Sequence, residues 1–318
     1  VQLYLKLGGV RVGCAVLCLL VAMLVIPYSV QRFIVWRKRS VSWVFSPIME
    51  IERPCPTPQY STLGQADAGK DLKICLTTLT DEKSKEAVSF LRKAIRWRNY
   101  DNILDLTWVS KQKYAQKHGY YLHDGSVNVD ISRPAQWSKI KAAQYLFEEE
   151  RCDWVLWHDA DTLFMNTDVR IQDFLPSDPN KDFVVTVDTP NPGYNSGSWL
   201  IKNSEWGRQF LQDWWDMKSY VRLPGQSLSG DNDAFKALLG SYSKEEFETH
   251  VGVPPRCTMN AFAKFLRPEE SQAMTEEDLK VQPWYLSENF YHKGDFLVHV
   301  PGYNNKFGTL EMLMKEIQ

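Results

Sequence analysis

The stretch that decides the fold is Trp154-Val-Leu-Trp-His158-Asp159-Ala-Asp161-Thr-Leu-Phe-Met-Asn166. Its first four residues are aromatic or aliphatic, which is typical of a buried strand. Alternate side chains of a strand point the same way, so Asp159 and Asp161 are expected on one face. Two such charges repel each other, and burying them unpaired would cost several kcal/mol. A bound divalent cation removes this cost, and carboxylate oxygens suit Mn²⁺ or Mg²⁺ that bridges to substrate phosphates.

The alternative is that the two carboxylates simply cap the strand and face water. A bare Asp-x-Asp is short enough to favour that interpretation. Here the tripeptide follows a strongly apolar strand within an α/β pattern. Ligands bind at the carboxyl ends of strands in open α/β sheets, so this context favours the metal site.

Strands and helices are expected to alternate around this stretch. Strands are predicted at 72–79, 120–123, 183–187, 199–201 and 296–300, and helices at 84–98, 105–118, 137–150, 205–217 and 231–239. Gly119 is expected to end the second helix, and Asn203 or Ser204 to cap the fourth. The alternation predicts an α/β fold, with a mostly parallel sheet and helices on both of its faces.

Three segments precede this domain, which is expected to span 71–318. Residues 12–30 form a nearly continuous apolar run of bilayer length, which predicts an uncleaved transmembrane signal anchor after a cytosolic stub at 1–11. A buried core helix is the alternative, although such helices are rarely apolar all round. Basic residues flank both ends of the run, so charge bias does not decide its orientation. Residues 31–70 lack periodicity and contain several Pro and Gly, as expected of a stem.

The composition is that of a globular protein without a polyanion-binding surface. The 318 residues are 44% hydrophobic and 24% charged, and the formal net charge is −2. No basic stripe with interleaved aromatics is present, so no nucleic-acid partner is expected. The cysteines show no zinc spacing. Cys75 and Cys152 are expected to be buried thiols, and a disulfide among Cys55, Cys75, Cys152 and Cys257 is open if the domain is lumenal.

Three further segments combine residues that suit a sugar or phosphate ligand. Asn195-Ser-Gly-Ser198 is dense in turn formers and predicts either an ordinary loop or one that offers amides and small polar groups to a sugar. Gly230-Asp-Asn232 opens an expected helix, where Asp either caps the helix or stabilises positive charge at a glycosyl carbon. His299 ends a late strand, and its neutral imidazole suits Mn²⁺, although a lone strand histidine is more often a satisfied core residue. After it, Gly302 permits close backbone approach and Lys306 can meet a phosphate.

Taken in order, these motifs resemble those of glycosyltransferase family 34, the membrane-anchored galactosyl-, mannosyl- and xylosyltransferases. The resemblance covers roughly residues 72–306. It rests on Tyr114-Ala-x-x-His118-Gly119-Tyr120, Trp137-x-Lys139, Trp157-x-Asp159-x-Asp161, Asn195-Ser-Gly197-Ser198, Gly230-Asp231-Asn232 and Asp295-Phe-Leu-Val-His299-x-x-Gly302.

The resemblance implies a GT-A fold, a nucleotide-sugar donor, Mn²⁺ (or Mg²⁺) and transfer with retention of anomeric configuration. It implies that Asp159, Asp161 and His299 hold the metal, and that Asp231 and Asn232 lie at the reacting sugar. It places the following residues at or near the donor: Thr77, Thr78, Trp137, Lys139, Asn195, Ser196, Gly197, Gly302 and Lys306.

The resemblance also implies an oligosaccharide or polysaccharide acceptor, a single-pass type II Golgi membrane protein with a lumenal domain, and the possibility of oligomers with related transferases. Galactose or mannose is favoured over xylose, because the segment after Asp161 lacks the insertions associated with the plant enzymes. Two other functions compete. A metal-dependent phosphatase or nuclease would need a second metal cluster, which the sequence does not show. A non-catalytic sugar-binding or scaffold protein on the same fold is the other.

Overall fold

The computed structural model describes residues 4–7, 10–13, 72–80, 102–188, 193–222, 230–263, 291, 294–302 and 306–317. The chain divides into two compact units, one of residues 1–45 and 265–274 and the other of 46–264 and 275–318. In the first unit, β1 (Tyr4–Leu7) pairs antiparallel with β2 (Val10–Gly13).

The predicted anchor at 12–30 overlaps the end of β2 and otherwise lies outside the described residues. The predicted stem at 31–70 and the predicted helix at 84–98 also lie outside them. Within the described ranges, no helix combines the length and the apolar character that a membrane crossing needs.

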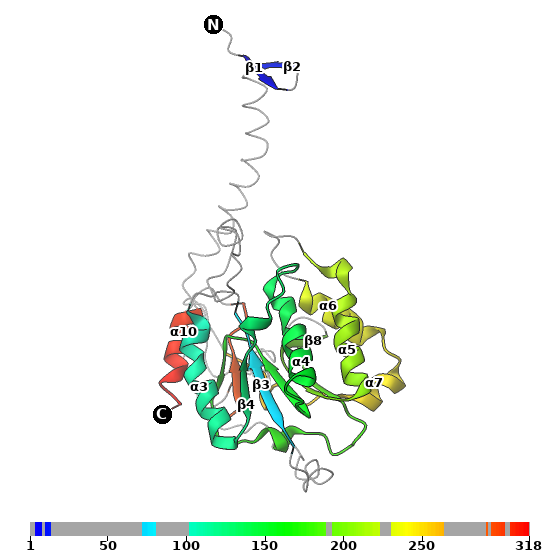
Figure 1. The fold of residues 1–318 in the computed structure, drawn as a ribbon. Coiled ribbons are helices and arrows are strands. Elements are labelled where there is room, and N and C mark those ends of the chain that lie inside the picture. The colour runs from blue at the N-terminus through cyan, green and yellow to red at the C-terminus, as the bar shows by residue number, and fades with distance from the viewer. Residues whose placement is uncertain are drawn as a thin grey trace, which may run out of the picture. The chain divides into compact units, whose positions relative to one another are not determined.

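A six-stranded mixed sheet forms the centre of the second unit (Figure 1). Its order is β4 (Tyr121–Asp124), β3 (Ile74–Thr78), β5 (Trp154–His158), β8 (Tyr194–Lys202), β7 (Phe183–Val187) and β9 (Val251–Gly252). β8 runs antiparallel to both of its neighbours, whereas all the other pairings are parallel. The sheet is therefore mixed because of this one reversed strand.

Helices cover both faces of this sheet, as the alternating pattern predicts. The helices are α3 (Ile103–His118), α4 (Ser138–Glu148), α5 (Glu205–Asp216), α6 (Asp231–Ser241), α7 (Lys244–His250) and α10 (Lys306–Met314). Figure 1 shows α3 and α10 on one side of the sheet and α4, α5 and α6 on the other. Gly119 ends α3 with a left-handed φ of 71°, and the Ser204 hydroxyl caps α5 by accepting from the Gly207 amide.

Alternate side chains of β5 pack into two separate hydrophobic cores. Val155 and Trp157 lie in the core that includes α4, α5 and α6. Trp154 and Leu156 lie in the core that includes α3. Both faces of β5 are therefore buried, which explains why its sequence is apolar without interruption.

A second sheet, of three strands, pairs residues 297–299 with residues 162–164, which follow β5. Its order is β10 (Ala261–Phe262), β11 (Leu297–His299) and β6 (Thr162–Phe164). β11 pairs antiparallel with β6, and the register places His299 opposite Thr162. The Val300 amide continues the pairing by donating to the Asp161 carbonyl, at 3.0 Å. This pairing brings His299 beside the two aspartates.

β8 is longer than the sequence predicts. A strand was expected only at 199–201, and Asn195-Ser-Gly-Ser198 was expected as a loop. In the structure this segment belongs to β8, with Ser198 opposite His158 of β5 and Tyr194 opposite Val187 of β7. Pairing on both sides outweighs the turn preference of these residues.

Cys75 of β3 and Cys152, which precedes β5, form a disulfide across 77 residues. Both side chains are fully buried, as expected, and of the two expectations, thiols or a disulfide, the disulfide is correct. Cys257 is also disulfide-bonded. Adjacent parallel strands β3 and β5 bring Cys75 and Cys152 together, and sequence spacing alone does not show that pairing.

Replacing Cys75 and Cys152 together by alanine is expected to lower the free energy of unfolding by about 4 kcal/mol. A cross-link that closes a loop of this length removes that much chain entropy from the unfolded state. Denaturant unfolding of the wild type and the double variant, both without reductant, measures the difference. A loss below about 1 kcal/mol would show that this cross-link does little to stabilise the domain.

Candidate metal centre

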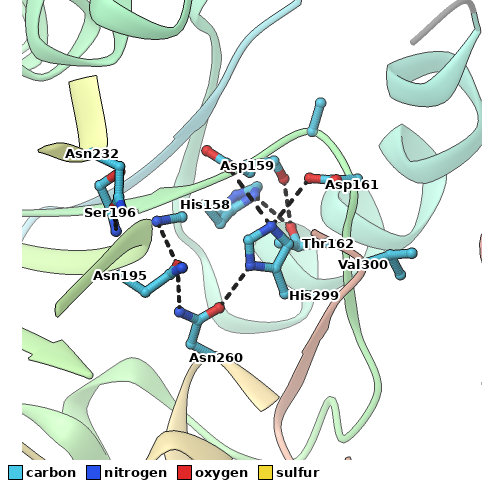
Figure 2. A network of polar contacts seen from close by, with 12 residues as sticks. His158, Asp159, Asp161, Thr162, Asn195, Ser196, Asn232, Asn260, His299 and Val300 are labelled. Atoms are coloured by element: carbon cyan, nitrogen blue, oxygen red, sulfur yellow. Dashed lines mark hydrogen bonds and ion pairs between the residues drawn. The ribbon is translucent and has the colours of Figure 1, made fainter. Parts of the chain in front are cut away.

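Two carboxylates and an imidazole converge just beyond β5 (Figure 2). One ligand atom from each of Asp159, Asp161 and His299 lies within 4.8 Å of the others. His299 Nε2 is 3.3 Å from Asp161 Oδ1 and 3.6 Å from Asp159 Oδ2. Asp161 and His299 are buried, whereas the Asp159 side chain is 32% exposed, so the cluster opens toward solvent on that side. This set of oxygen and nitrogen donors fits Mn²⁺ or Mg²⁺.

A tight turn between β5 and β6 presents the two aspartates. The Thr162 amide and hydroxyl both donate to the Asp159 carbonyl, at 3.2 and 2.7 Å. The Asp159 amide donates to the Gly197 carbonyl of β8 at 2.8 Å. Asp159 and Asp161 were expected to share one face of a strand, but they follow the strand. The turn, rather than strand alternation, directs both of them toward His299.

Lys111 of α3 holds the turn between β5 and β6 through hydrogen bonds. Its fully buried ammonium group donates to the carbonyls of Ala160 and Thr162, at 3.1 and 2.7 Å, and to the Thr107 hydroxyl at 2.9 Å. Burial lowers the pKa of Lys111 to about 7, against the opposing effect of Asp161 and Asp159. The sequence analysis missed this residue, because one lysine in an amphipathic helix is ordinary.

The wild type is expected to gain stability relative to Lys111→Met as the pH rises from 7 to 9. The pKa of Lys111 is about 7 in the folded chain, below its ordinary value of 10.5. In this window the unfolded chain keeps a proton that the folded chain releases, so folding is favoured by up to about 1.4 kcal/mol per pH unit. Denaturant unfolding of both proteins at the two pH values measures the change. A constant difference would mean that Lys111 stays protonated.

Lys306, at the start of α10, neutralises the second oxygen of Asp161. Its ammonium group forms an ion pair with Asp161 Oδ2 and donates to the Val300 carbonyl. Burial raises the pKa of Asp161, but the Lys306 ammonium and the hydrogen bonds to Asp161 outweigh it and hold the pKa well below its usual value. In the sequence Lys306 is a candidate to meet a donor phosphate, and that role stays a prediction. In the structure its ammonium is buried and paired with Asp161.

Lys139 of α4 links the metal cluster to Asp231. Its Nζ lies 3.0 Å from Asp231 Oδ2 and 3.5 Å from Asp159 Oδ1, and it donates to the Ser196 carbonyl at 3.2 Å. Burial lowers the pKa of Lys139, but Asp159 and Asp231 outweigh this effect and raise it. Lys139 therefore places one positive charge between the carboxylates of Asp159 and Asp231.

Residues 195–198 and 232 lie beside the cluster, and their described contacts are with other residues of the chain. The Asn232 side-chain carbonyl accepts from the Ser196 amide at 2.8 Å, so Asn232 anchors β8 to the start of α6. Gly197 lies against the imidazole of His299. A Cβ atom at position 197 would stand 2.3 Å from His299 Cε1, so only glycine leaves room for this ring.

Gly197→Ala is expected to weaken Mn²⁺ binding at least about 10-fold, because the added methyl group displaces His299. Gly240→Ala is the matched control, because a Cβ atom there meets nothing within 4 Å. Calorimetric titration of both variants with Mn²⁺ measures the effect. Equal affinities would mean that the ring does not depend on the space above Gly197.

The remaining predicted donor residues lie at different depths. Thr77 and Thr78 end β3 fully buried, and their hydroxyls have no hydrogen-bond partner within the described ranges. Trp137 is fully buried in the core that contains α4, edge-on to Trp215. Gly302 follows β11 with a left-handed φ of 81°. Trp137 thus packs in the interior, whereas Thr77 and Thr78 keep unpaired hydroxyls at the carboxyl end of a strand.

The motif Tyr114-Ala-x-x-His118-Gly119-Tyr120 has a structural role. The Tyr114 hydroxyl donates to the Val169 carbonyl at 2.9 Å, and the ring stacks on Phe164. His118 Nε2 lies 2.8 Å from the Thr167 carbonyl, and the Tyr120 hydroxyl accepts from the Ile171 amide at 3.0 Å. The motif therefore holds residues 167–171 in place, which follow the turn that carries Asp159 and Asp161.

Two family profiles match the chain. That of the galactosyl transferase GMA12/MNN10 family matches residues 88–190, and that of a family of unknown function, DUF273, matches residues 140–261. Among solved structures, a glycosyltransferase involved in the glycosylation of the major capsid of PBCV-1 aligns with a TM-score of 0.47 and 14% identity. The alignment covers 76% of this chain and 99% of that one.

Two fungal proteins are similar to a longer part of the chain than either family profile. A probable alpha-1,6-mannosyltransferase, MNN10 of Saccharomyces cerevisiae, is 29% identical over 203 residues, which are 53% of this chain and 50% of that protein. An alpha-1,2-galactosyltransferase of Schizosaccharomyces pombe is 22% identical over 244 residues, covering 66% and 58%. The chain thus spans about half the length of the curated relatives it matches. By its motifs and by these matches, the chain is similar to the galactosyl- and mannosyltransferases of glycosyltransferase family 34.

Proposed function

We propose that this chain is a metal-dependent glycosyltransferase that moves a hexose or pentose from a nucleotide sugar to a glycan acceptor. The cluster of Asp159, Asp161 and His299 at the carboxyl end of β5 carries the proposal. The similarity to proteins named as a probable alpha-1,6-mannosyltransferase and an alpha-1,2-galactosyltransferase supports it. UDP-galactose, GDP-mannose and UDP-xylose are the proposed donors, with galactose or mannose favoured, and the fold is proposed to be of the GT-A type.

The charged residues around the cluster suit a reaction that separates charge. Mn²⁺ or Mg²⁺ held by Asp159, Asp161 and His299 would offset the negative charge on a departing nucleoside diphosphate. Lys306 and Lys111 hold the metal turn in place through Asp161 and through two backbone carbonyls. Asp231 offers a negative charge toward the positive charge that develops at a glycosyl carbon.

Retention of anomeric configuration is part of the proposal. The carboxylate of Asp231 is already bound to Lys139 at 3.0 Å, which makes it a poor covalent nucleophile. We therefore favour attack of the acceptor hydroxyl on the same face of the sugar that the diphosphate leaves. The reaction then needs no enzyme-bound sugar ester, unlike the usual retaining hydrolases.

The proposal includes a compartment and partners. We place the protein in the Golgi membrane as a single-pass type II protein with a lumenal domain, acting on an oligosaccharide or polysaccharide, with oligomers of related transferases as one possibility. The Cys75–Cys152 disulfide supports an oxidising compartment, because such bonds are rare in the cytosol.

The proposal is tested by offering the purified chain UDP-galactose, UDP-glucose, UDP-xylose and GDP-mannose, each with Mn²⁺ or with EDTA. We expect release of UDP or GDP from one donor, dependent on the metal and strongly reduced in His299→Ala. Folded protein that neither releases nor binds a nucleotide would refute the proposal. That result would favour a non-catalytic sugar-binding or scaffold protein.

A further inference from the structure

Asn260 joins the imidazole of His299 to a line of polar side chains (Figure 2). We infer that Asn260 is a positioning residue that holds the ring proton of His299 on Nδ1, so that the Nε2 lone pair faces Asp159 and Asp161. This inference deepens the proposed function, because it concerns the proposed metal ligand. It also assigns Asn195, which the sequence relates to the donor sugar, to the support of that ligand.

The contacts of Asn260 are short and enclosed. His299 Nδ1 lies 2.9 Å from Asn260 Oδ1, and both side chains are buried. The amide nitrogen of Asn260 donates to Asn195 Oδ1 at 2.9 Å and to the Thr186 hydroxyl at 3.2 Å. Asn260 precedes β10, which pairs in parallel with β11. The register places Phe262 opposite His299, so Asn260, two residues earlier, lies diagonally from His299.

Fixed donors and acceptors determine the direction of every amide in this line. Asn195 Nδ2 lies 3.3 Å from a carboxylate oxygen of Asp188, which is paired with Lys236 and can only accept. On its other side Asn195 Oδ1 accepts from the Gly197 amide at 2.9 Å, and that group can only donate. Asn195 therefore has one allowed orientation, and it presents oxygen to Asn260.

The same logic fixes the tautomer of His299. Because Asn260 gives its NH₂ group to Asn195, it turns its carbonyl oxygen to His299 Nδ1. An oxygen acceptor 2.9 Å away requires a proton on Nδ1, and a neutral ring then leaves Nε2 unprotonated. A charged pair on Asp188 and Lys236 and a backbone amide at Gly197 thus decide where one proton of the metal centre resides.

The ring needs this support because the aspartates favour the opposite tautomer. His299 Nε2 faces Asp161 Oδ1 at 3.3 Å, so a proton on Nε2 could bond directly to that carboxylate. Such a proton would occupy the lone pair that a metal ion needs. Asn260 opposes this by offering an acceptor on the far side of the ring, as outer partners of metal-bound histidines generally do.

Nitrogen-15 NMR of the metal-free full chain at about pH 8.5, above the ordinary histidine pKa, reports the tautomer directly. The spectrum of His299→Gln assigns the His299 signals. We expect the proton on Nδ1 in the wild type and in Thr186→Val, a control that removes one bond of Asn260 but leaves its carbonyl in place. We expect it on Nε2 in Asn260→Leu and Asn260→Ala. A wild-type proton on Nε2 would overturn the inference, even if neither Asn260 variant folds.

Mn²⁺ titration of the same proteins is the second readout. Asn260→Leu is expected to bind Mn²⁺ about 10- to 100-fold more weakly than the wild type, and Thr186→Val within about 3-fold of it. Equal affinities of Asn260→Leu and the wild type would also overturn the inference. If the wild type binds no Mn²⁺, the proposed function fails, while the NMR result still decides the role of Asn260.

Discussion

Asp161→Asn is expected to lower the rate of sugar transfer at least about 100-fold. The variant keeps the shape of the side chain but removes the charge on Oδ1, which faces His299 Nε2 at 3.3 Å. Loss of one preorganised charge or donor at a reacting centre commonly costs a factor of about 100 to 1,000 in turnover. Steady-state kinetics with the accepted donor, at saturating Mn²⁺, measures the effect. Near-normal turnover would refute the assignment of Asp161 to the metal.

A loss of folding must be separated from this loss of chemistry. The neutral amide of Asp161→Asn would remove the negative charge that Asp161 places against the buried Lys306 ammonium, and breaking a buried ion pair typically costs about 3–5 kcal/mol. Asp161→Asn combined with Lys306→Met removes both charges. We expect the double variant to recover most of the free energy of unfolding but none of the transfer rate. Recovery of both would mean that Asp161 serves stability alone.

Lys139→Met is expected to lower the free energy of unfolding by about 3–5 kcal/mol and to reduce turnover as well. The substitution removes the ammonium group that lies between Asp159 and Asp231. Breaking a buried ion pair by removing one partner is strongly unfavourable. Denaturant unfolding measures the loss, and Lys141→Met on the same helix is the control. Lys141 bonds to Gln144 rather than to a carboxylate, so its loss should cost less than about 1 kcal/mol.

Acid provides a second check on the Lys139 variant. Removal of the Lys139 ammonium should raise the pKa of Asp231 in the folded variant relative to the folded wild type, because a nearby positive charge favours the carboxylate. The folded variant then binds a proton more readily than the folded wild type, so its stability relative to the wild type increases as the pH falls. The difference between the two proteins should shrink on acidification. A difference that stays constant would locate the destabilisation in lost packing rather than in charge.

The part of the site that local patterns encode could be predicted from the sequence. The apolar run before Asp159 identifies a strand that is buried on both faces, and the helix ends at Gly119 and Ser204 follow from capping preferences alone. The cluster of Asp159, Asp161 and His299 was named correctly as a group, since the three side chains do meet.

The parts that depend on pairing between distant segments could not be predicted. Residues 195–198 look like a loop until β5 and β7 flank them. The ion pair of Lys306 with Asp161 forms only because α10 brings the two residues together. Asn260 belongs to no motif, and its role arises only because β10 lies beside β11. Each of these outcomes is set by strand register or by helix docking, which local composition does not report.

The position of β11 has a consequence for biosynthesis. Asp159 and Asp161 leave the ribosome well before His299 and Lys306, yet the antiparallel pairing of β6 with β11 is what unites them. Until that late strand is delivered, Asp161 has neither its imidazole nor its ammonium neighbour. Contacts between segments so far apart in the chain form slowly. A nascent chain therefore cannot assemble the cluster of Asp159, Asp161 and His299 stepwise, because the cluster forms only after the segment that carries β11 has left the ribosome.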